Sequence, residues 1–98
     1  MKETTVDLRR AAGKREAIKL IYKAIGFDGE AGTNLDALAD VLSAWGMPVR
    51  IRMLYWKSFC DRETVAADGI RSVLDDMMVE NRNIVAAYLS GGKRSGLR

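Results

Sequence analysis

The sequence predicts an α/β fold in which a small three-stranded parallel sheet is packed with helices. Within the 98 residues, short apolar segments of strand length alternate with longer segments of helical periodicity. The order strand, helices, strand, helix, strand favours parallel strands joined by right-handed crossovers. This length suits a single domain, which we expect to span residues 1–90, followed by a flexible, glycine-rich basic tail at residues 91–98.

The N-terminal quarter of the chain predicts one strand followed by one helix. Thr4–Leu8 is short, β-branched and alternating, which is typical of a strand. From about Lys14 to Ile25, apolar residues recur at helical spacing, and Gly26 then begins a glycine-rich loop. The opposite side of this first helix carries a basic flank formed by Lys14, Arg15, Lys19 and Lys23.

The second predicted helix lies in "EAGTNLDALADVL", residues 30–42. Thr33 is its expected N-cap, with Asp36 three residues later at the capping-box position, and Pro48 marks the end of the segment. Asp36 and Asp40 are four residues apart and point away from the apolar face, so both should be exposed. That apolar face is formed by Leu35, Leu38, Leu42 and Trp45.

The C-terminal half predicts two more strands and a further helix. Val49–Tyr55 alternates between apolar and basic residues, as in a strand with one face open to solvent. Ser58–Ala67 suggests a short helical turn, and a helix capped by Asp68 should then extend to about Asn83. The continuous apolar run Ile84–Leu89 predicts a central strand covered on both faces.

Composition argues against an enzyme, a metal site or a cofactor. The chain has no histidine, which is the commonest general base near neutral pH and the commonest metal ligand. Cys60 is the single cysteine, so no internal disulfide can form, and we expect a cytoplasmic protein. No apolar stretch approaches the length of a membrane span, so we expect no membrane association.

Charge is distributed unevenly along a chain whose net charge is +3. Residues 1–23 carry seven basic and three acidic groups, whereas residues 24–49 carry four acidic groups and no basic one. Like charges four residues apart on a helix oppose each other by about 0.2–0.5 kcal/mol. The positive end of the helix dipole offsets this cost for Asp36, which lies in the first turn. Asp40 lies beyond the first turn, so we expect it to interact with a cationic partner outside the helix.

Within this acidic segment, "GTNLDALADVL" resembles the signature G-x-N-L-D-A-L-W-D-x-L of the barstar family of ribonuclease inhibitors. "LYWKSF", "DGIRSVL" and "YLS" follow in the order of that family, and the likeness covers about residues 4–90. It implies the fold predicted above and a second helix that plugs the active site of a basic ribonuclease. The chain departs from the pattern at several positions: Ala39 replaces the motif tryptophan, Glu30 begins the pair that replaces two tyrosines, and Val79 replaces a glutamate on the last helix.

By motif position, the resemblance assigns Asp40 as the main binding residue, with Asp36 as its companion and Asn34 preceding both. Trp45 matches a tryptophan at the rim, and the expected binding surface is completed by Leu35, Ala39 and Glu30. The two carboxylates would then mimic RNA phosphates in a cleft rich in arginine and lysine, the partner being a basic ribonuclease or another basic protein.

An alternative function is a nucleic-acid-binding regulatory domain that uses the basic first helix and the C-terminal tail. We consider nucleic acid the less favoured partner, because the basic residues are interspersed with acids and aromatic residues are few. Neutralising Asp36 and Asp40 should abolish ribonuclease binding and leave nucleic-acid binding intact. The oligomeric state is left open.

Overall fold

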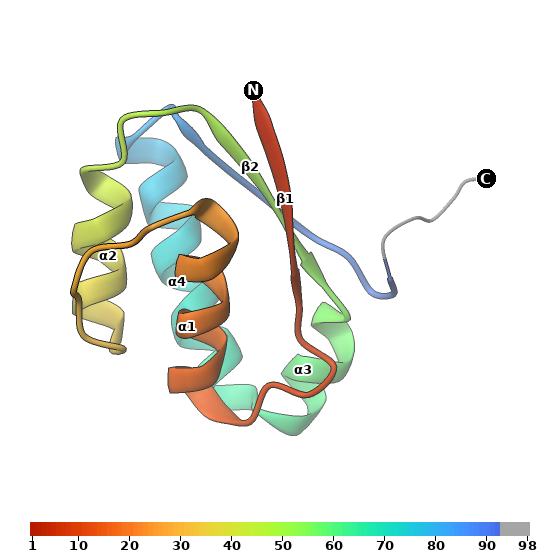
Figure 1. The fold of residues 1–98 in the computed structure, drawn as a ribbon. Helices are drawn as coiled ribbons and strands as arrows, with labels where there is room; N and C mark the ends of the chain where they lie inside the picture. The colour runs from red at the N-terminus through yellow and green to blue at the C-terminus, as the bar shows by residue number, and fades with distance from the viewer. Residues whose placement is uncertain (93–98) are drawn as a thin grey trace.

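Three parallel strands form one sheet, and the helices cover a single face of it (Figure 1). The computed structural model describes residues 1–92. It confirms the predicted α/β fold class, a three-stranded parallel sheet packed with helices. In chain order the elements are β1 (Lys2–Asp7), α1 (Gly13–Ile25), α2 (Leu35–Ser43), β2 (Val49–Leu54), α3 (Trp56–Arg62), α4 (Thr64–Glu80) and β3 (Ile84–Tyr88).

Strand β2 lies at the centre of the sheet, with Val49 opposite Lys2 of β1 and Ile84 of β3. Alternate side chains of β2 are buried beneath the helices, while Arg50 on the opposite face is exposed. That open face is polar, and Glu3 of β1 pairs there with basic residues of β2. The sequence therefore predicted the one-sided burial of β2 correctly.

The prediction that residues 84–89 form a central strand covered on both faces is wrong. β3 is an edge strand, and only its first residue, Ile84, is fully buried. Its other side chains are small or half-buried, and Val85 and Ala87 need no covering layer because short apolar side chains cost little when partly exposed. A continuous apolar run indicated a strand here but did not fix its place in the sheet.

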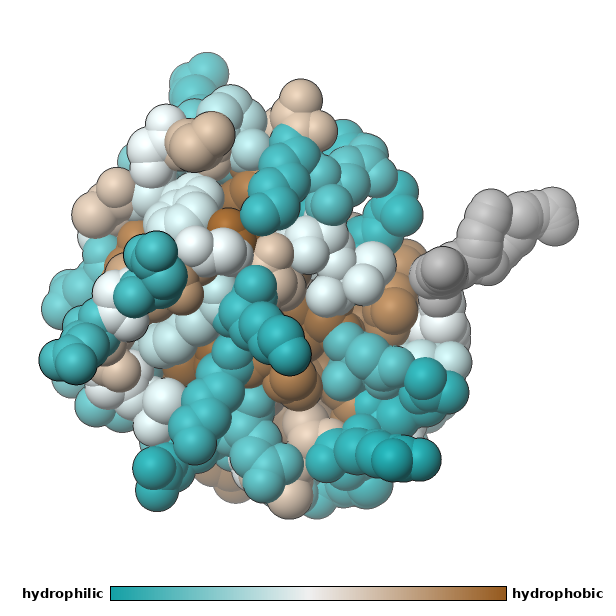
Figure 2. Space-filling view, in the orientation of Figure 1, coloured by the Kyte–Doolittle hydropathy of each residue, from teal (hydrophilic) through white to brown (hydrophobic). Residues whose placement is uncertain are grey.

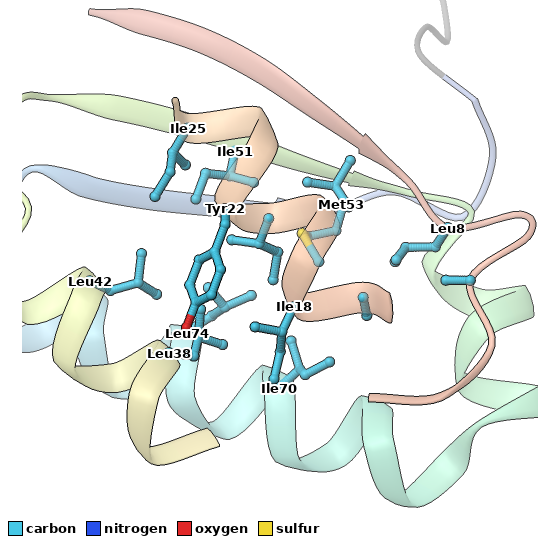
Figure 3. Close-up of a cluster of buried hydrophobic side chains, with 14 of the residues drawn as sticks. Leu8, Ile18, Tyr22, Ile25, Leu38, Leu42, Ile51, Met53, Ile70 and Leu74 are labelled. Carbon is cyan, nitrogen blue, oxygen red and sulfur yellow. The ribbon is translucent and has the colours of Figure 1, made fainter. Parts of the chain in front are cut away.

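The hydrophobic core fills the space between the sheet and helices α1, α2 and α4, and no charged or polar residue of the described chain is buried. Figure 3 shows side chains of α1 projecting between those of β2 and those of α2 and α4. The labelled residues in this cluster are Leu8, Ile18, Tyr22, Ile25, Leu38, Leu42, Ile51, Met53, Ile70 and Leu74.

The N-cap of α2 is Asn34, one residue after the predicted Thr33. Asn34 has an extended backbone, and its Oδ1 accepts a hydrogen bond from the Ala37 N–H at 2.8 Å. Thr33 instead accepts a hydrogen bond from Arg15 Nε at 3.2 Å through its Oγ1. Asparagine is the more favoured N-cap of the two residue types, and the Thr33 hydroxyl has a different partner in Arg15.

We expect Asn34→Ala to lower the free energy of unfolding by about 1 kcal/mol, because the Ala37 N–H would lose its acceptor. Thr33→Ala is the matched control and should cost about 0.5 kcal/mol or less, since it removes only one exposed surface bond. Urea unfolding of both variants measures the difference. A larger loss for Thr33→Ala would place the cap where the sequence had predicted it.

The helices that follow β2 also begin earlier than predicted. α3 starts at Trp56, and α4 starts at Thr64, so Asp68 lies inside α4 and is not its cap. Thr64 Oγ1 donates to the Cys60 carbonyl at 2.9 Å, and the apolar face of α4 already includes the buried Ala67. Because alanine contributes weakly to hydrophobic periodicity, the pattern underestimated the length of this helix.

The described chain ends just after β3. The Gly91 carbonyl accepts a hydrogen bond from the Tyr55 N–H at 2.9 Å. The rest of the predicted tail, residues 93–98, lies outside the described residues, and the domain boundary at residue 90 stays a prediction. Across residues 1–92, no helix has the length and apolar character that a membrane crossing requires.

Candidate functional site: the acidic face of α2

Asp36 and Asp40 lie on the solvent side of α2, and both are exposed, as the helical pattern predicts. Residues four apart on a helix place their Cβ atoms about 5–6 Å from each other. Neither carboxylate forms an ion pair or a side-chain hydrogen bond with any residue that the structure describes. The helix therefore presents two adjacent negative charges that the fold itself does not neutralise.

The opposite side of α2 anchors the helix in the core. Leu38 and Leu42 are fully buried there. At the start of the helix, Leu35 packs against α4 at Gly69, where an added Cβ would lie only 2.7 Å from the Leu35 Cδ1. Glycine at this position thus permits the close approach of the two helices, and α2 is held against α4 along its apolar side.

The loop before α2 is fixed by aromatic contacts. The Phe27 ring packs against Tyr22 and Trp45, with centroid distances of 5.2 Å and 6.4 Å. The Tyr22 hydroxyl donates to the Gly32 carbonyl at 2.9 Å. Burial raises the pKa of Tyr22, and the negative charge of Asp40 raises it further, so this hydroxyl keeps the proton that it donates. These contacts fix the position of the residues that lead into the N-cap of α2.

Two asparagines before β3 fix the other end of α2. Asn81 Nδ2 donates to the Leu42 carbonyl at 2.8 Å and to the Trp45 carbonyl at 2.9 Å. Asn83 Nδ2 donates to the same Trp45 carbonyl at 3.1 Å. These bonds tie the last turn of α2, and Trp45 just beyond it, to the segment before β3. Sequence reasoning assigned both asparagines only to the end of a helix, and nothing local signals contacts more than 30 residues away.

The structure brings the sequence-predicted site residues onto α2 and its two flanking loops, but exposes them unequally. The exposed ones are Glu30, Asn34, Asp36 and Asp40. The half-buried ones are Leu35, Ala39 and Trp45, which pack against the core and leave only part of their surface to solvent. The exposed side chains of this face are thus acidic or polar, and the apolar side chains contribute only the parts of their surface that the core leaves uncovered.

A comparison with protein-family models matches residues 1–89 to "Barstar (barnase inhibitor)". The chain belongs to the barstar family. The match spans every helix and strand of the described structure, including α2 and both of its flanking loops. A search of curated proteins found no relative.

Barstar-family membership confirms the resemblance drawn from the α2 motif, and it supports a ribonuclease inhibitor and not an enzyme. The family name also identifies the kind of partner, a barnase-like ribonuclease.

Proposed function

We propose that this barstar-family protein inhibits a basic, barnase-like ribonuclease by inserting the exposed face of α2 into the active site, where Asp36 and Asp40 replace RNA phosphates. The observation that carries this proposal is the pair of exposed, unpaired carboxylates one turn apart on a helix fixed at both ends. A ribonuclease cleft holds arginine and lysine side chains to bind phosphate, and a carboxylate offers these cations the same charge and acceptor geometry.

Rigid presentation favours this mode of binding. The N-cap bond of Asn34 and the two carbonyl bonds of Asn81 hold α2 in place before any partner arrives. A preorganised surface loses less conformational entropy on association, so more of the contact energy contributes to affinity. The uncompensated negative charge would also attract a basic partner over a distance and raise the association rate.

Within this surface we assign the main contact to Asp40 and a supporting one to Asp36. Trp45 and Leu35 would contribute apolar contact through their exposed parts, and Asn34 and Glu30 polar contact at the rim. Ala39, between the two aspartates, adds little surface of its own. Aromatic anchors usually supply much of the energy of an interface, and Ala39 stands where the family motif has a tryptophan. Binding by this chain should therefore depend on charge more strongly than binding by a family member with that tryptophan, and its affinity should fall steeply with salt.

Titration of barnase with the protein, with RNA hydrolysis as readout, tests the proposal. We expect activity to fall in proportion to the inhibitor added and to reach its minimum at one inhibitor per ribonuclease. Full activity in the presence of a large molar excess would contradict the proposal for this ribonuclease. A cytoplasmic location stays a prediction, and fractionation of the source cells tests it separately.

A further inference from the structure

A second feature of the molecule lies at the carboxyl ends of β1 and β2, away from α2 (Figure 1). Three adjoining hollows of about 420, 340 and 350 Å³ meet there, and Asp7 lines all of them. Their volumes fall within the range of small-molecule sites, about 300–1,000 Å³. In open α/β sheets, ligands bind in the crevice beyond the carboxyl ends of the strands.

A flat cation, the Arg9 guanidinium, lines two of these hollows. The Arg9 guanidinium lies 4.6 Å from the centroid of the Tyr55 ring, and its Nη2 donates to Asp7 Oδ2 at 2.6 Å. Its Nε contacts both carboxylate oxygens as well, so Asp7 fixes the plane of the group. The Arg9 side chain nevertheless keeps 60% of its surface exposed. One face of the guanidinium therefore rests on Tyr55 while the side chain stays accessible to a ligand.

Tyr55 occupies a strained backbone position beneath this cation. Its φ of 60° makes it the only non-glycine residue of the described chain with a positive φ. Such a conformation costs of the order of 1–3 kcal/mol and persists where the surrounding structure enforces it, often at functional sites. Here the Tyr55 N–H donates to the Gly91 carbonyl at 2.9 Å. From this position the Tyr55 ring packs against the Arg9 guanidinium.

The lining of the hollows is basic and partly apolar. Asp7 is engaged by Arg9, and Glu16 accepts the Ala12 N–H at 2.9 Å. Arg10, Lys19 and Lys23 line the same hollows, and none of the three forms an ion pair with a residue that the structure describes. Figure 2 shows hydrophilic side chains standing over the region of α1 with hydrophobic surface between them.

We propose that this edge of the sheet binds single-stranded RNA, with one base stacked on the outer face of the Arg9 guanidinium and the backbone phosphates beside Arg10, Lys19 and Lys23. Single-stranded RNA is recognised by stacking on aromatic rings or arginine planes combined with a basic path for the backbone. Asp7 already occupies the Nε and Nη2 donors of Arg9, so the group offers a ligand mainly its planar face, which suits a base better than a carboxylate and favours RNA over an acidic protein surface. This site is separate from α2 and does not rest on the proposed inhibition.

The chain offers a matched control for the stacked arginine. Arg71 lies 4.3 Å from the centroid of the Tyr88 ring and pairs with Asp75, which reproduces the arginine, tyrosine and aspartate arrangement on α4. Arg71 lines none of the three hollows. Its side chain is 54% exposed, close to the value for Arg9. Substitution of either arginine by lysine keeps the charge and removes the planar surface.

Fluorescence anisotropy with a labelled single-stranded oligoribonucleotide tests the proposal on the full chain. We expect Arg9→Lys to weaken binding by about fivefold to a hundredfold, the range for the loss of one stacked base, and Arg71→Lys to change it by less than about twofold. Arg10→Gln should reduce the slope of log affinity against log salt by about 0.7, whereas Arg71→Gln should leave the slope unchanged. Equal melting temperatures for all variants exclude unfolding as the cause.

Three results would overturn the proposal: no binding of the oligoribonucleotide by the wild type, equal losses for Arg9→Lys and Arg71→Lys, or equal affinity for a polyglutamate peptide of the same charge. Duplex RNA of the same sequence should bind more weakly, because its bases are already stacked. Inhibition of barnase by Arg9→Lys should match the wild type, so failure of the two proposals can be told apart.

Discussion

Replacement of Leu38 by alanine should lower the free energy of unfolding by about 2–5 kcal/mol, which is among the largest losses expected from any single substitution in this protein. Leu38 is fully buried at the middle of α2, in the cluster that joins this helix to α1 and α4 (Figure 3). The substitution removes apolar surface and leaves a cavity, because the neighbouring side chains relax only partly.

Urea unfolding measures this loss, provided that the dependence of the unfolding free energy on urea concentration is the same for wild type and variant. Val65→Ala is the control. Val65 is 86% exposed, so its truncation should change the free energy of unfolding by no more than about 0.5 kcal/mol. A loss below about 1 kcal/mol for Leu38→Ala would contradict the packing of α2 described above, since an exposed or loosely packed leucine gives values of that size.

Asp40→Ala should weaken binding to the ribonuclease without lowering the stability of the protein. Asp40 is exposed and forms no ion pair with the described chain, so its removal should leave the melting temperature unchanged or raise it slightly through relief of repulsion with Asp36. In the proposed complex the same carboxylate faces a buried cation, and truncation leaves that cation unpaired at a cost of about 2–5 kcal/mol. Affinity for barnase should therefore fall by at least about 30-fold.

Asp61→Ala provides the matched control for Asp40→Ala. Asp61 is an exposed aspartate on α3, distant from α2 in Figure 1, and its 3.6 Å surface pair with Lys57 contributes little to stability. The two variants have the same net charge, so a difference between their affinities for barnase reflects where the aspartate lies and not the overall charge. Unfolding of Asp40→Ala would show that the acid is structural, and equal affinity of the two variants would remove Asp40 from the interface.

Periodicity alone predicted which side of α2 faces solvent. The alternation of leucines at helical spacing placed Leu38 and Leu42 in the core and Asp36 and Asp40 outside, and the structure confirms this arrangement. Hydrophobic pattern works here because burial of an apolar face is the main force that holds the helix in the fold. The order of segments predicted a parallel sheet for a related reason, since β1 and β2 are each followed by a helical crossover to the next strand.

What the sequence could not provide depends on contacts between distant residues. Thr33 and Asn34 are both residue types that cap helices, and the structure shows that Asn34 accepts the Ala37 N–H whereas Thr33 contacts Arg15 on another helix. The edge position of β3 follows from strand order, which local apolarity does not encode. The sequence pattern also gives no sign of the contact between Arg9 and Tyr55, which lie at the ends of two different strands and line one hollow together.

The central claim is that the α2 carboxylates occupy phosphate positions in the ribonuclease cleft. Its most direct test is calorimetric titration of barnase with the protein in the presence of a ribonucleotide that fills the ribonuclease active site. If α2 replaces RNA phosphates, the apparent Kd should rise in proportion to the ribonucleotide concentration once that concentration exceeds the ribonucleotide's own Kd. An apparent Kd that stays constant while the active site is saturated with ribonucleotide would contradict the claim.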